Sequence, residues 1–200
     1  MKTVCRAILS GIMVWVLITA FAPVTAKAEE SLTGNVNVFL GTKALNEDDW
    51  SPAENQTEAG VELDFESPSW PVSLVLGLRG SSGEGDFVDP LLGSGSVEGK
   101  TSELSLGIKK IWAPDAHTHP FVGGGLAFVE GEFSAAFAAG SVSDSDTAVG
   151  IWLGGGVYWT LGEHFNVGLD LRLSSADVTL FSVDGAAGGA HIGVLLGYHF

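Results

Sequence analysis

Three groups of side chains in this sequence have types and spacings that could support chemistry. The run D-A-H-T-H contains Asp115, His117 and His119, and alternate residues of an extended segment point the same way, as ligands of one transition-metal ion must. Two histidines and one aspartate beside a turn make an incomplete ligand set. We therefore predict solvated turn side chains here and no metal site.

The second group is acidic. Glu47, Asp48 and Asp49 are followed by Glu54 and Glu58, which makes this the densest cluster of carboxylates in the chain. Carboxylate oxygens suit Ca²⁺ or Mg²⁺, and such an ion could bridge the segment to anionic phosphates. The spacing does not match the calcium-binding loop of an EF-hand. A solvated acidic loop is the simpler interpretation.

The third group could bind phosphate or catalyse a reaction. The glycine runs at 123–125 and 154–156 lie inside strand-like patterns and lack a following Lys-Ser or Lys-Thr, so they are not phosphate-binding loops. His191 lies toward the middle of a strand-like stretch, but catalysis would also require a serine or threonine nucleophile beside it. We predict no cofactor and no catalytic residue.

The N-terminus has the pattern of a cleaved secretory signal. Two basic residues precede an apolar run over 7–22, and the sequence A-K-A that ends at Ala28 is a typical cleavage site. We predict a signal peptide over 1–28 and one mature domain over 29–200. The alternative, an uncleaved membrane anchor, would need a longer apolar run.

Charge narrows the range of partners. Removal of the signal takes away the only cysteine, Cys5, and leaves six basic residues against 24 acidic ones, a net charge of −18. Phosphate contacts need a basic patch, so a nucleic-acid partner is excluded. The mature chain contains no apolar run near the ~20 residues of a spanning helix, so a membrane location would require a closed barrel.

Eight stretches of alternating polarity follow the signal, and each of the first four is near the roughly 9 to 11 residues of a tilted spanning strand. They cover about 33–41, 57–65, 72–80, 100–112, 123–128, 149–160, 165–174 and 186–200. Four connections between them are long and rich in Gly, Ser, Asp and Glu, and the other three are short. The long ones are 42–56, 81–99, 131–147 and 175–185.

The last stretch ends the chain with one apolar face. Its outward residues are Ile192, Val194, Leu196, Tyr198 and Phe200. A terminal aromatic with a second aromatic two residues earlier resembles the closing strand of the small eight-stranded bacterial outer-membrane barrels, the class of the OmpA transmembrane domain and OmpX. The resemblance covers about 31–200. It implies an all-β fold, an eight-stranded antiparallel up-and-down transmembrane barrel, in which this strand is the signal read by the barrel-assembly machinery.

The resemblance also implies an orientation. Short turns lie in the periplasm in such barrels, so both termini should be periplasmic and the long acidic loops extracellular. Aromatic residues next to the short turns would form the periplasmic girdle. These residues are Trp70, Trp112, Phe121, Trp159 and Phe165.

The residues that we predict to face the barrel interior include charges of both signs. These charged residues are Glu62, Asp64, Arg79, Glu103, Lys109, Asp170 and Arg172. Eight strands enclose just enough space for side chains, so we predict a filled lumen with no open pore. A buried charge without a partner costs several kcal/mol, and each arginine should therefore meet a carboxylate across the lumen.

We therefore predict a non-enzymatic, monomeric outer-membrane barrel whose acidic loops act in envelope integrity or surface contact. Its partners would be membrane lipid, lipopolysaccharide and, during biogenesis, the assembly machinery. Two alternatives remain. A lipid-modifying enzyme would place a Ser or Thr beside His191 at the outward rim, and a soluble lipocalin-type barrel would turn the apolar parity inward.

Overall fold

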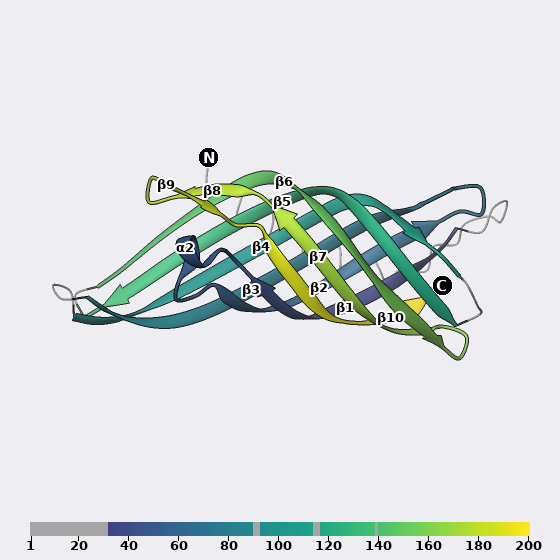
Figure 1. Ribbon diagram of the computed structural model, residues 1–200, viewed down its shortest axis with the longest axis horizontal. Coiled ribbons are helices and arrows are strands. Elements are labelled where there is room, and N and C mark those ends of the chain that lie inside the picture. The colour runs from purple at the N-terminus through teal and green to yellow at the C-terminus, as the bar shows by residue number, and fades with distance from the viewer. Residues whose placement is uncertain (1–31, 90–92, 114–116, 139) are drawn as a thin grey trace. The chain divides into compact units, whose positions relative to one another are not determined.

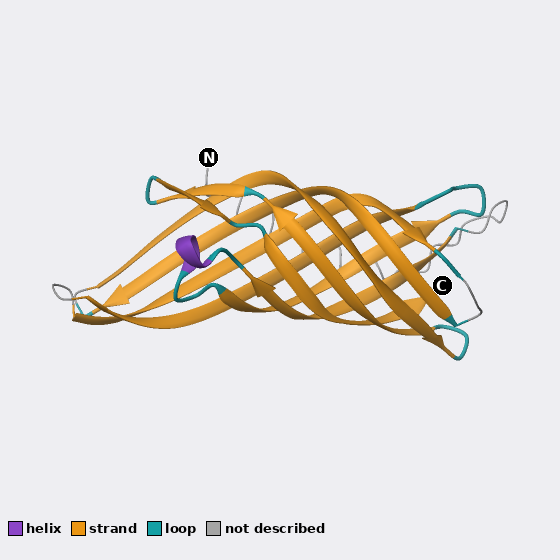
Figure 2. Cartoon of the chain, in the orientation of Figure 1, coloured by secondary structure: helices purple, strands orange, loops and turns teal. Residues whose placement is uncertain are grey.

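The chain forms one closed antiparallel barrel. The computed structural model describes residues 32–89, 93–113, 117–138 and 140–200, so the predicted signal peptide and Asp115 lie outside the described residues. The wall strands are β1 (Thr33–Ala44), β2 (Asn55–Glu66), β3 (Ser73–Asp89), β4 (Gly93–Ile111), β5 (Thr118–Phe137), β6 (Gly140–Leu161), β7 (Phe165–Ser175) and β10 (Gly189–His199). Each pairs with its sequence neighbour in the wall, and β10 closes the ring against β1. The predicted eight-stranded up-and-down barrel is confirmed (Figures 1 and 2).

Side chains alternate between the lumen and the exterior, as the sequence predicts. On β7 the odd-numbered residues from Phe165 to Leu173 are exposed, whereas Asn166, Asp170 and Arg172 are buried. A lipocalin-type barrel would have the opposite arrangement, so that alternative is wrong. Each of the eight wall strands contributes apolar residues to the exterior, and together these residues form an apolar band around the barrel.

The strands β3 to β6 are much longer than predicted. We predicted loops at 81–99 and 131–147, but β3 pairs with β4 as far as Asp89 and Gly93, and β5 pairs with β6 as far as Phe137 and Gly140. These segments are rich in small and acidic residues, and most of their outward side chains are polar, so a search for outward apolar residues misses them. We call residues 83–89, 93–99, 131–137 and 140–147 the projecting sheet (Figure 1).

Two short elements fill the other long connections. The helix α2 (Glu47–Trp50) follows β1, and Asn46 caps its N-terminus by accepting a hydrogen bond from the Asp48 amide. The hairpin of β8 (Asp177–Leu180) and β9 (Val183–Ala186) lies between β7 and β10. No helix in the described part of the chain is long and apolar enough to cross a membrane.

Four aromatic residues of the predicted girdle lie on the exterior near the short turns. These are Trp70, Trp112, Trp159 and Phe165. Phe121 does not join them, because its side chain points into the lumen and is only 4% exposed. On β5 the exterior parity belongs to Val122 and Leu126, and the glycines at 123–125 conceal this in the sequence.

Candidate functional site: the lumen and its apolar cork

The barrel interior is lined by charges from six strands. We call this set the lumen charge network: Lys43, Glu58, Glu62, Asp64, Arg79, Glu103, Lys109, Asp170, Arg172 and His191. Each of these side chains is at most 3% exposed. They converge because every second residue of a barrel strand points inward and opposite walls of an eight-stranded barrel are close.

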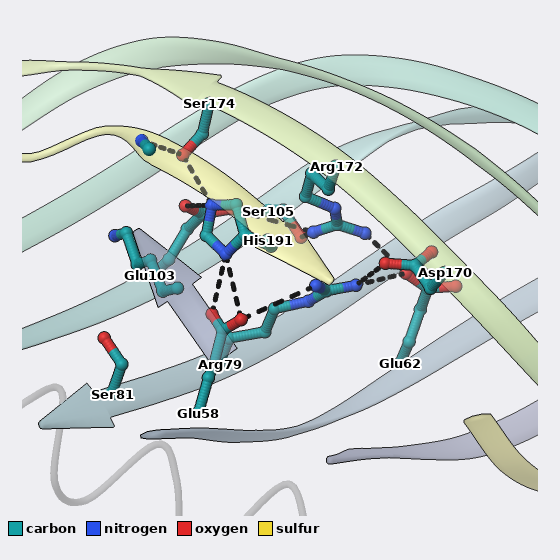
Figure 3. A network of polar contacts seen from close by, with 12 residues as sticks. Glu58, Glu62, Arg79, Ser81, Glu103, Ser105, Asp170, Arg172, Ser174 and His191 are labelled. Carbon is teal, nitrogen blue, oxygen red and sulfur yellow. Dashed lines mark hydrogen bonds and ion pairs between the residues drawn. The ribbon is translucent and has the colours of Figure 1, made fainter. Parts of the chain in front are cut away.

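Glu62 is the centre of the network. Its carboxylate accepts a hydrogen bond of 2.6 Å from Arg172 Nη2 and another from Lys109 Nζ, and it lies 3.9 Å from Arg79 Nη2. One carboxylate therefore faces three cations that come from β3, β4 and β7. Figure 3 shows dashed lines from both guanidinium groups that converge on the carboxylates of Glu62 and Asp170.

The remaining charges of the predicted set also have partners. Arg79 donates to Asp170 at 2.8 Å, Arg172 lies 3.6 Å from Glu103, and Lys109 lies 3.5 Å from Asp64. The structure thus brings all seven predicted network residues together, and each arginine meets a carboxylate across the lumen.

Aromatic rings that the sequence analysis did not assign to the lumen support the cations. The Arg79 guanidinium lies 4.0 Å from the centroid of the Phe39 ring, and that of Arg172 lies 4.2 Å from the Trp152 ring. Lys109 Nζ lies 4.6 Å from the centroid of Phe121. Such cation–π contacts gain strength where water is excluded.

Glu58 and Lys43 correct a sequence prediction. We placed Glu58 in the exposed acidic cluster and Lys43 in the loop after the first strand, but both face the lumen. Glu58 shares the parity of Glu62 and Asp64 on β2, and Lys43 lies near the end of β1. Lys43 Nζ donates to Thr101 Oγ1 and to the carbonyl of Ala187, each at 2.9 Å.

His191 lies at the end of the lumen charge network that is nearer to the β8–β9 hairpin. Its Nδ1 lies 2.9 Å from both carboxylate oxygens of Glu58, and its Nε2 lies 2.9 Å from Ser174 Oγ (Figure 3). Glu103 Oε2 lies 3.8 Å from the same Nε2. A serine, a histidine and a carboxylate are therefore in line, which is the arrangement that an enzyme would need.

An apolar cluster closes the lumen above His191. We use the name cork for six of its buried residues: Leu45, Trp50, Val129, Ala176, Val178 and Ala187. Trp50 is 1% exposed, and its indole Nε1 donates to the carbonyl of Ala186 at 2.8 Å. Asp49 accepts from the Ala186 amide at 2.9 Å, so α2 and β9 are clasped together. The sequence indicated only an acidic loop here, since the single tryptophan gave no periodic signal.

The predicted assembly strand occupies the seam of the barrel. Its five apolar residues, from Ile192 to Phe200, are all exposed on the exterior. Gly34 and Phe200 exchange two backbone hydrogen bonds of 3.1 and 3.0 Å, so the end of the chain is tied to its first strand. The described residues contain no group of three or more His, Cys, Asp or Glu side chains placed to hold a metal ion.

Solved structures of bacterial outer-membrane proteins share this fold. OprG of Pseudomonas aeruginosa matches with a TM-score of 0.56 and 13% identity over 86% of this chain and 98% of its own. A major outer-membrane protein of Thermus thermophilus gives 0.55 and 12% over 85% and 100%. Ail, the attachment invasion locus protein of Yersinia pestis, in complex with the heparin analogue sucrose octasulfate, gives 0.51 and 14% over 86% and 100%.

Sequence comparisons add no closer relative, because no protein-family model and no curated protein matches the chain. The structural matches are below 25% identity and therefore concern the fold. By its fold, the chain is a small eight-stranded barrel of the outer-membrane type.

Proposed function

We propose that this protein resides in an outer membrane as a closed, non-enzymatic barrel and that its projecting sheet makes contacts at the cell surface. One observation carries the proposal. Along β3 to β6 the exterior changes from apolar to polar, and on β3 and β4 the interior also changes from charged to apolar. On β5, Leu126 is exposed and Glu130 and Glu132 follow it on the same exterior parity, whereas Val129 is fully buried inside.

Strand length supports the membrane location. A tilted strand needs about 9 to 11 residues to span the hydrocarbon core. The strands β7 and β10 have 11 residues each, whereas β3 to β6 have 17 to 22. The excess in β3 to β6 is the projecting sheet, which would extend into water on one side.

The lumen would not conduct. Ion pairs occupy its middle, the cork covers one end, and such a filled interior suits mechanical rigidity. The short turns and the C-terminus lie at the end opposite the projecting sheet, so the sheet would be extracellular and the termini periplasmic. The terminal strand would serve the assembly machinery, and the apolar band would contact lipid and lipopolysaccharide as a monomer.

The projecting sheet has features of a contact surface. In the described residues β3 pairs with β2 only up to Ser82, so 83–89 have an unpaired edge. Such an edge can accept an extended segment of another protein. The exterior of this sheet carries Glu84, Asp86 and Glu98, and the acidic charge disfavours a sulfated sugar of the kind seen with Ail.

Cell fractionation tests the location. We expect the wild type in the outer membrane, with faster gel migration before heating than after, and we expect a variant that lacks Phe200 to lose both properties. Lys100→Ala, on the exterior of β4 next to the projecting sheet, is the control and should behave as the wild type. A soluble periplasmic protein without a gel shift would overturn the proposal.

A second candidate, a lipid-modifying enzyme, is favoured by the alignment of Ser174, His191 and Glu58. Against it, His191 is only 2% exposed and Ser174 Oγ already accepts from the Gly189 amide at 3.3 Å. A fluorophosphonate probe separates the two candidates. We expect no labelling of the wild type beyond that of Ser174→Ala. Labelling that depends on Ser174, together with release of fatty acid from lipopolysaccharide, would establish the enzyme.

A further inference from the structure

The tip of the β8–β9 hairpin has an unusual turn. Leu180 pairs with Val183, and the two residues between them, Phe181 and Ser182, have φ angles of 50° and 69°. Two-residue hairpin turns with two positive φ angles normally contain Asn-Gly or similar residues. A phenylalanine in this region is an outlier that costs free energy and persists only where the surroundings hold it.

The turn displays apolar side chains to the solvent. Phe181 is 47% exposed and Val183 is 68% exposed. The base of the same hairpin behaves differently, because Val178 is 1% exposed within the cork. The hairpin is therefore anchored at one end and carries an apolar knob, Phe181 and Val183, at the other.

Carboxylates hold the knob in position. Asp144 on β6 accepts from the Phe181 amide at 2.8 Å, and Asp146 accepts from the Thr179 amide at 2.9 Å. Thr179 Oγ1 donates to Asp184 at 2.8 Å across the hairpin. The knob is thus preordered, which reduces the entropy lost on binding.

The surroundings indicate the chemistry of the partner. Asp144, Asp146 and Asp184 place three carboxylates beside the hairpin that carries the exposed aromatic ring. Negative charge favours a basic partner, and the face of a phenylalanine ring attracts cations as well as apolar groups. Anionic phosphates of a glycolipid are disfavoured at the same place.

We propose that Phe181 and Val183 form a docking knob for a basic protein surface that also offers an apolar pocket. This site is separate from the unpaired edge of β3, which lies on the opposite border of the projecting sheet. On this proposal, the strained backbone at Phe181 is retained because the aromatic ring is needed for binding. The stability of the barrel does not require it.

A pair of variants separates binding from folding. Phe181→Asn combined with Ser182→Gly supplies the preferred turn residues, so the hairpin should be at least as resistant to proteolysis as in the wild type. Val183→Ser removes the second apolar group without touching the turn. Val88→Ser, at another exposed apolar residue of the projecting sheet, is the control.

The probe is an amphipathic lysine–leucine peptide titrated against the protein in lipid nanodiscs. We expect about tenfold weaker binding for Phe181→Asn/Ser182→Gly, a smaller loss for Val183→Ser, and no change for Val88→Ser. Equal binding by all four proteins would show general attraction to acidic charge and would overturn the proposal. Capture of lipopolysaccharide vesicles that depends on Phe181 would also overturn it, in favour of a glycolipid contact.

Discussion

The part of the barrel with an apolar exterior and the projecting sheet share the strands β3 to β6 but have opposite polarity. On β4, Ile108 and Leu106 face outward while Lys109 and Glu103 face the lumen. Farther along the same strand, Lys100 and Glu98 are on the outside and Val97 is buried within. The alternation is unbroken, and only the assignment of the two faces is exchanged.

The proposed membrane location accounts for this exchange, because the surrounding solvent decides which side chains the exterior of a barrel can carry. Within the hydrocarbon core, lipid-facing residues must be apolar, and an eight-stranded lumen then collects the polar side chains. Beyond the hydrocarbon core the ordinary rule of soluble proteins returns, with an apolar interior around Trp50 and a charged exterior. Four mutational comparisons test this difference.

The largest effect should come from Glu62→Gln. The substitution leaves Arg79, Lys109 and Arg172 without their shared carboxylate, and an uncompensated buried charge costs about 3–5 kcal/mol. Urea unfolding in micelles, followed by tryptophan fluorescence, measures the loss. Glu84→Gln on the exterior of the projecting sheet should change stability by about 0.5 kcal/mol at most. Equal effects would remove the distinction between the two regions.

Trp50→Ala should cost about 3 kcal/mol, because it leaves a large cavity in the cork. We expect the effect to be local, with faster hydrogen exchange at the Ala186 amide and an unchanged rate in β7. Amide exchange read by mass spectrometry distinguishes these segments. Val88→Ala is the control, since Val88 is 80% exposed. Uniform acceleration across the barrel would mean that the cork and the lumen form one cooperative unit.

Leu169→Arg should cost about 2 kcal/mol, because Leu169 lies in the middle of the apolar run on β7 and an arginine there would face hydrocarbon. Ser143→Arg places the same side chain on the exterior of the projecting sheet, where we expect almost no change. The midpoint of the gel shift on heating compares the two variants. A stable Leu169→Arg barrel would place this part of β7 outside the membrane.

Two ion pairs of equal length give the smallest effect and the sharpest contrast. Lys100 and Glu98 lie 2.6 Å apart on the exterior, as do Arg172 and Glu62 in the lumen. An exposed pair contributes at most about 1 kcal/mol, so Glu98→Gln should shift the unfolding midpoint barely or not at all. If Glu98→Gln lowered the stability as much as Glu62→Gln does, the exterior of the projecting sheet would not be exposed to solvent.

Much of the fold could be predicted from alternation alone. The parity of β7 is visible in its sequence, and the seven charged residues on inward parities are all buried in the structure. The assignment of strands and faces failed where the alternation was weak, or where the exterior residues were polar and the interior residues apolar. Glycines at 123–125 concealed the inward direction of Phe121, and the small residues around 131–147 appeared as a loop because their outward side chains are polar.

The upper end of the site could not be predicted for a different reason. Trp50 contacts Ala186 from a position far away in the chain, and no local period connects them. Ser174 and His191 lie on neighbouring strands, but their contact depends on the register between β7 and β10, in which Ser174 stands opposite Gly189 and not opposite His191. Register of this kind is set by the closed barrel as a whole.

The clasp between α2 and β9 also bears on the order of folding. Asp49 and Trp50 reach Ala186 across sequence separations of 137 and 136 residues, and contacts so distant form only after the intervening chain has been arranged. We therefore expect the cork to form late in folding, after the last strand has closed the wall and the charges of the lumen have paired.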